Sequence, residues 1–143
     1  LLCYRVPMTP ETDALRAQQD AAFDPILAWA KAQHGMLFVL TEGLMPVPQP
    51  EASLQKLGQL FAAANDGELA ALSMLVPILG SALLVLAVWQ GQLTIEDALI
   101  AARLDEAASE ARYGVDMEMA AKWADKCRDA RAAAFFLTCN QQK

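Results

Sequence analysis

The feature that most constrains the fold of this chain is an uncharged run from residue 69 to residue 95. Apolar residues occupy every helical face of the run, and such a helix either lies at the centre of a bundle or spans a membrane. The run reaches the length of a membrane span, which needs about 20 apolar residues. Neither end carries the Lys and Arg bias that orients a span, because the flanking charged residues are acidic: Asp66, Glu68, Glu96 and Asp97. We therefore expect a central bundle helix, with a break or kink near Pro77 and no stable membrane insertion.

Composition and charge indicate one packed domain that does not bind nucleic acid. The 143 residues, of which 55% are hydrophobic, suffice for one packed core. A formal net charge of −6 argues against nucleic-acid binding, which needs clustered Lys and Arg. An acidic protein-interaction domain fits this balance.

The residue types needed for catalysis or for metal binding are sparse. Cys3, Cys127 and Cys139 form no close pair, so neither a disulfide framework nor a metal site is expected. The single histidine, His34, adjoins a helix end, where a capping or surface role is expected. No phosphate-binding glycine loop is present. We expect no enzyme activity and no cofactor.

Helix-start and helix-stop signals divide the rest of the chain. Thr9 before Pro10 predicts a helix start, and Asp24 before Pro25 predicts a second helix or a kink. An apolar run over residues 36–41 suits a short buried strand, and prolines at 46, 48 and 50 favour an extended connector. Further helices are expected from Pro50 to residue 64 and from Asp116 to Leu137. Asp116 is expected to cap the second of these helices, and Cys127 to be buried in it. The predicted fold is mainly α, a bundle of about four to six helices with one short extended or β segment.

A carboxylate interrupts the apolar stripe of the helix predicted after Thr94. The Thr94 cap and the absence of Pro or Gly before Gly114 predict a single helix of about five turns. Its apolar positions 95, 99 and 102, continued with the same spacing, reach Glu106 and then Tyr113. Glu106 should therefore face the interior or a partner.

Two hypotheses for Glu106 remain open. It could pair with Arg103 or with a basic residue of the last helix, in a purely structural role. Alternatively, it is a charged anchor on a surface that faces a partner.

Several segments, in order, resemble the Atp12-type assembly chaperones of F-type ATP synthase. These segments are residues 2–5, 23–29, 41–51 and 103–107, followed by Tyr113 and Gly114. The resemblance implies a chaperone that binds the free α subunit and shields it until a β subunit replaces the chaperone. It places Asp105 and Glu106 on the acidic pair of the family, so that Arg103, Asp105, Glu106 and Tyr113 are the expected partner-binding residues. Ala108 and Tyr113 stand where members commonly carry an aromatic residue and a tryptophan.

The resemblance also implies a domain organisation. Family members combine an amino-terminal β-rich domain with a helical domain, so residues 1–8 are expected to end the first or to form a linker. Residues 9–143 then form the helical chaperone domain, and the chain is the carboxy-terminal part of a larger α+β protein. A monomer in the bacterial cytoplasm is expected, with the mitochondrial matrix as the other location. A generic helical interaction module and a membrane-associated helical protein are the alternative functions.

Overall fold

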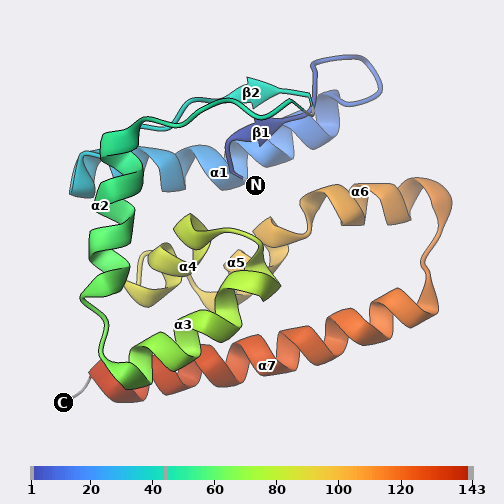
Figure 1. The fold of residues 1–143 in the computed structure, drawn as a ribbon. Helices are drawn as coiled ribbons and strands as arrows, with labels where there is room; N and C mark the ends of the chain where they lie inside the picture. The colour runs from blue at the N-terminus through green and yellow to red at the C-terminus, as the bar shows by residue number, and fades with distance from the viewer. Residues whose placement is uncertain (1, 44, 142–143) are drawn as a thin grey trace. The chain divides into compact units, whose positions relative to one another are not determined.

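The computed structural model describes residues 2–43 and 45–141, and the chain divides between Ala63 and Ala64 into two compact units. The described residues contain seven helices and one two-stranded sheet (Figure 1). The expected fold class, mainly α with a short β segment, is thus confirmed. The sequence pattern does not mark the boundary at Ala63, and the family resemblance implies one helical domain from residue 9.

The first unit combines two helices with a small parallel sheet. Its elements are β1 (Tyr4–Arg5), α1 (Asp13–His34), β2 (Thr41–Glu42) and α2 (Glu51–Ala62). Tyr4 lies opposite Thr41 in the sheet. Helix α1 begins three residues after the predicted start, because Thr12 N–H bonds to the Thr9 carbonyl in a preceding turn. It continues through Pro25 as one helix, which decides between the two alternatives for this segment.

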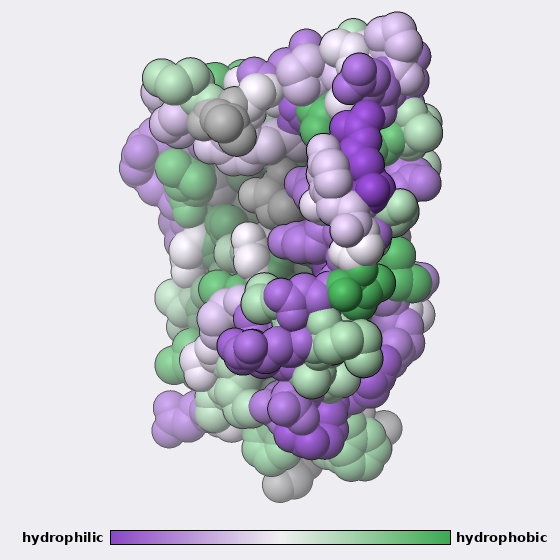
Figure 2. Space-filling view, turned by 90° about the vertical axis from the view of Figure 1, so that its right-hand side faces the viewer, coloured by the Kyte–Doolittle hydropathy of each residue, from purple (hydrophilic) through white to green (hydrophobic). Residues whose placement is uncertain are grey.

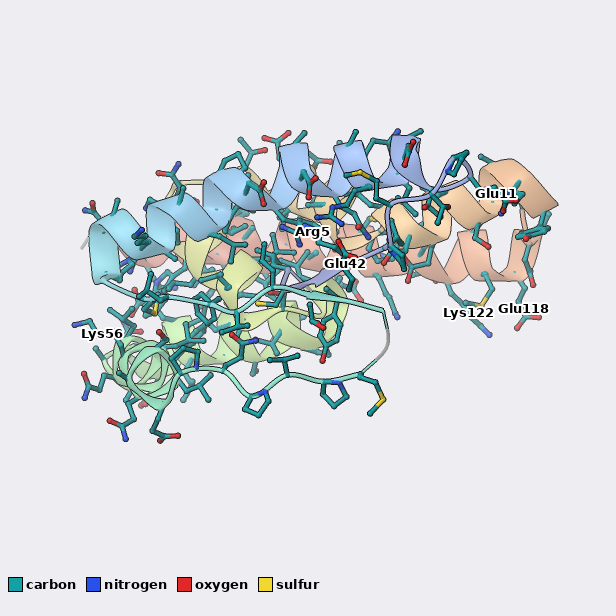
Figure 3. All side chains as sticks on the ribbon, turned by 90° about the horizontal axis from the view of Figure 1, so that it is seen from above. Arg5, Glu11, Glu42, Lys56, Glu118 and Lys122 are labelled. Carbon is teal, nitrogen blue, oxygen red and sulfur yellow. The ribbon has the colours of Figure 1, made fainter. Side chains whose placement is uncertain are left out.

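A buried arginine fixes the sheet against α1. The Arg5 side chain is fully buried, and its guanidinium lies 4.9 Å from the centroid of the Phe23 ring. It donates to Asp20 over 3.0 Å and to Asp24 over 2.8 Å, both on α1. Figure 3 shows Arg5 close to Glu42, whose carboxylate accepts a hydrogen bond from Arg16. This charged network adds to a small apolar core formed by Leu2, Phe23, Ile26, Ala30 and Met36.

The segment predicted as a buried strand lies mostly on the surface. Only Met36 in residues 36–41 is buried, and β2 contains just the last of these residues and its neighbour. Side chains complete the backbone hydrogen bonding: Ser53 Oγ bonds to both Leu37 N–H and Leu37 C=O. The Gln49 amide does the same for Val39. These bonds replace a neighbouring strand, so the segment is extended without forming a buried sheet.

The second unit contains the remaining five helices. They are α3 (Asp66–Leu79), α4 (Ala82–Trp89), α5 (Ile95–Ala102), α6 (Leu104–Tyr113) and α7 (Met117–Gln141). Helix α3 lies along α7, and α4 and α5 also pack in this unit (Figure 1). The core consists of apolar side chains from four helices, among them Leu72, Leu75, Leu84, Leu99 and Leu137.

The uncharged run forms two helices that meet at a break. Helix α3 contains Pro77 and ends at Gly80, whose φ of 62° lies in the left-handed region. Ser81 then caps α4, its hydroxyl accepting from Leu84 N–H. The predicted break near Pro77 is confirmed. In the described part of the chain, no helix combines the length and the apolarity that crossing a membrane requires.

Candidate partner-binding surface

The single helix predicted from Thr94 to Gly114 is broken at Arg103. The start is as predicted, since Thr94 Oγ1 accepts from Asp97 N–H. Arg103 has φ −121° and ψ 17°, outside the helical region, and it separates α5 from α6. Its guanidinium pairs with Glu110 and lies 5.3 Å from the centroid of the Trp123 ring on α7. The prediction of one helix is therefore wrong. No Pro or Gly in the sequence marks the break, which coincides instead with the contacts of Arg103 to Glu110 and Trp123.

The expected partner-binding residues lie on or next to α6, a helix with little packing against the rest of its unit. None of its residues is buried. Because the break separates α6 from the buried stripe of α5, Glu106 does not face the interior but lies exposed. Arg103 pairs with Glu110 rather than with Glu106, so the structural hypothesis of an Arg103–Glu106 pair is contradicted.

The predicted site residues lie on the exposed surface of α6 and at its start. Glu106, Ser109 and Tyr113 are all exposed and follow one face of the helix, with about 10 Å of axial rise from the first to the last. Asp105 is exposed beside this face. Arg103 precedes α6 and contributes by holding it through Glu110 and Trp123.

Exposed apolar side chains around the turn from α6 to α7 extend the predicted site beyond Tyr113. We call Tyr113, Val115, Met117 and Met119 the α6–α7 tip; their exposed fractions are 78%, 57%, 78% and 57%. Figure 2 shows hydrophobic side chains, in green, reaching the surface among hydrophilic ones on the side of the molecule that carries this turn. The sequence signals the tip only in part: Met117 falls outside the α7 stripe that contains Trp123 and Cys127, whereas Met119 lies one turn before Trp123 on that stripe and is nevertheless exposed.

The turn that presents these side chains is fixed by local hydrogen bonds. Asp116 Oδ1 accepts from Glu118 N–H over 2.9 Å and from Met119 N–H over 3.2 Å, so it caps α7 as predicted. Gly114, with φ 93°, ends α6. Lys122 pairs with Glu118 one turn along α7 (Figure 3). The tip therefore displays apolar side chains on a defined backbone.

A second surface feature lies toward the other end of α7. A pocket of about 510 Å³ opens between the α4–α5 turn and α7, with Leu93, Ile95 and the exposed Phe135 among its lining residues. At this site Arg131 donates to both oxygens of Glu96, over 2.6 and 2.8 Å. These bonds hold the pKa of the Glu96 carboxyl below its ordinary value, although burial opposes the shift. From the sequence, Glu96 is interpreted only as a first-turn acidic residue.

The cysteines and other metal-ligating residues form no site in the described residues. All three cysteines are free thiols, and no His, Cys, Asp or Glu cluster there could hold a metal ion. Cys127 is buried in α7, as predicted, and burial raises the pKa of its thiol. The described surface of α6 and the following turn carries exposed apolar groups and carboxylates.

The structure closely resembles solved structures of proteins from two bacteria. Atp12 from Paracoccus denitrificans matches with a TM-score of 0.89 and 32% identity, over 96% of this chain and 57% of that protein. Its D202K mutant matches with a TM-score of 0.89 and 31% identity, over the same shares. A protein of Agrobacterium tumefaciens described as a candidate chaperone matches with 0.86 and 37%, over 96% of this chain and 51% of that protein. No family model matches the sequence.

Proposed function

We propose that the chain belongs to the Atp12 family, over the part of those proteins that it spans, and that it is an assembly chaperone of F-type ATP synthase. In this role it binds the free α subunit and prevents its aggregation before a β subunit pairs with it. The observation that carries the proposal is the match to Atp12, at 32% identity and a TM-score of 0.89, over 96% of this chain. Since the chain spans only 57% of that protein, the proposal concerns what this part contributes.

The surface of α6 supports a binding role. A chaperone for an assembly intermediate must cover apolar surface that the final complex buries, and it must release that surface later. Tyr113 offers an exposed aromatic group for such contact, and Glu106 and Asp105 offer exposed carboxylates beside it. We place the α-subunit contact on this face, with Arg103 holding α6 in position through Glu110 and Trp123.

The same proposal covers activity and location. A chaperone of this kind needs no cofactor and catalyses no reaction, and the residues placed on α6 act by contact alone. Both organisms among the similar structures are bacteria, which supports the bacterial cytoplasm as the location. We propose that the chain acts as a monomer that forms a complex with one α subunit.

Aggregation of the isolated α subunit tests the function. Purified α subunit is diluted from denaturant, and light scattering is followed with and without an equimolar amount of the chain. We expect the chain to suppress scattering by α and to leave scattering by the β subunit unchanged. An unrelated acidic helical protein at the same concentration is the control. Equal scattering with the chain and with this control would contradict the proposal.

A further inference from the structure

We propose that the α6–α7 tip takes an apolar segment of the partner that is flanked by Lys or Arg. This inference rests on the proposed chaperone function and deepens it, because it names the contact surface and the chemistry of the segment bound there. It adds Val115, Met117 and Met119 to the site on α6.

The exposure of the tip is the first argument. Its four large apolar side chains lie within seven consecutive positions, and Tyr113 and Met117 are each 78% exposed. Four large apolar side chains exposed around one turn exceed the single, scattered apolar groups that are normal on a protein surface. Methionine adds adaptability, since its unbranched, polarizable side chain fits differently shaped apolar partners. A partner that is not yet in its final fold requires such a surface.

The backbone of the tip is the second argument. The Asp116 cap holds the first turn of α7, and Arg112 lies 6.0 Å from the centroid of the Tyr113 ring. A partner that binds here meets side chains on an already ordered turn. Less conformational entropy is then lost on binding than with a flexible loop.

The charges around the tip specify the partner. Residues 103–122 contain five carboxylates and three basic side chains. Two of the carboxylates, Glu110 and Glu118, pair with Arg103 and Lys122, respectively. Glu106 has no ion pair among the described residues, and it lies exposed on the α6 face that leads to Tyr113. This excess of carboxylates around exposed apolar side chains complements an apolar segment with basic neighbours.

The pocket near Phe135 is less suited to a basic segment. Phe135 is 71% exposed, but the nearby Glu96 is already neutralised by two hydrogen bonds from Arg131. Phe135 also lies 16 or more residues along α7 from the methionines of the tip, about 24 Å away in helical rise. Phe135 therefore provides a matched control at the opposite end of the same helix.

The test compares the Met117→Ser, Met119→Ser double variant with Phe135→Ser in the full chain. Each variant replaces exposed apolar surface, so we expect both to melt within about 2 °C of wild type. Binding to the α subunit is measured by surface capture, and binding to a labelled helical peptide of leucines and lysines is measured by fluorescence anisotropy. We expect the tip variant to bind both probes about tenfold more weakly and Phe135→Ser to bind them within about twofold of wild type.

The two probes separate failure of the docking site from failure of the function. If the tip variant binds both probes like wild type, or if only Phe135→Ser loses binding, the tip is not the docking site. If wild type binds the peptide through the tip but does not bind the α subunit, the proposed function fails while the docking chemistry stands. If wild type binds the α subunit but not the peptide, the basic apolar segment is the wrong partner chemistry.

Discussion

Two charged residues, Arg5 and Glu106, lie in opposite environments. Arg5 is fully buried and engaged with two carboxylates of α1 as well as with the Leu2 carbonyl, so it is part of the packing of the first unit. Glu106 is exposed on a helix that buries no residue. Substituting the first should therefore change stability, whereas substituting the second should change binding.

Charge reversal at Glu106 tests its role at the surface. We expect Glu106→Lys to weaken binding of the α subunit about tenfold, because a basic partner segment then meets a like charge. The melting temperature should stay within about 2 °C of wild type, since the side chain is exposed. Asp129→Lys, the same change at an exposed position of α7, is the control and should bind normally. Equal losses in both variants would indicate a general charge effect and not a contact at Glu106.

Replacement of Arg5 tests the buried network of the first unit. Arg5→Met keeps the apolar stem over Phe23 but leaves the buried Leu2 carbonyl without its donor. Since Asp24 is 56% exposed and its charge stays largely hydrated, we expect a loss of about 1–3 kcal/mol in stability. Urea denaturation measures this loss. Arg16→Met, which removes less buried ion pairs, should cost about 0–1 kcal/mol, and a reversed order would contradict this account.

At the scale of elements, α6 depends on few side chains for its position. It buries no residue, so apolar packing contributes little to holding it. Arg103 forms an ion pair with Glu110 of α6 and contacts the Trp123 ring of α7, which connects the two helices. A helix held this way opens locally at a lower free energy than the packed α3 and α7.

Hydrogen exchange of the α6 amides tests this anchor. In Arg103→Ala, we expect the amides of α6 to exchange about tenfold faster, because the ion pair and the ring contact are both lost. The amides of α3 and α7 should exchange as in wild type. Arg128→Ala, on the exposed side of α7, is the control and should leave α6 unchanged. Unchanged α6 exchange in Arg103→Ala would show that other contacts hold the helix.

The bridge between α5 and α7 should make stability depend on pH. Arg131 lowers the pKa of Glu96 in the folded state, so the pair stabilises the fold fully above the pKa of an unfolded glutamate. This stabilisation is lost as the pH falls through the lowered folded pKa. We expect Glu96→Gln to melt below wild type at about pH 7, and the difference to shrink as the pH is lowered towards about pH 3. A difference in melting temperature that stays constant between these pH values would contradict the role of the pair.

For the whole molecule, local signals predict the elements better than their interactions. The Thr94 and Asp116 caps, the break near Pro77 and the buried Cys127 are all predicted from short sequence patterns, and the structure confirms them. Such features depend on neighbouring residues, which the sequence shows directly.

Features that depend on distant contacts are not predicted from the sequence. The break at Arg103 involves Trp123 of another helix, and the Glu96–Arg131 pair joins residues 35 positions apart. The buried Arg5 likewise depends on carboxylates that only the packing of α1 brings near. The sequence predicts that Glu106 faces either the interior or a partner, and only the tertiary structure shows that it is exposed.

Complex formation with the α subunit tests the central claim most directly. The chain is mixed with freshly refolded α subunit and separated by size-exclusion chromatography coupled to light scattering, before and after addition of β subunit. We expect a complex of one chain with one α subunit, and release of the free chain when β is added, because β takes over the shielded surface. A chain that elutes alone in the presence of folded α subunit, without β, would contradict the account.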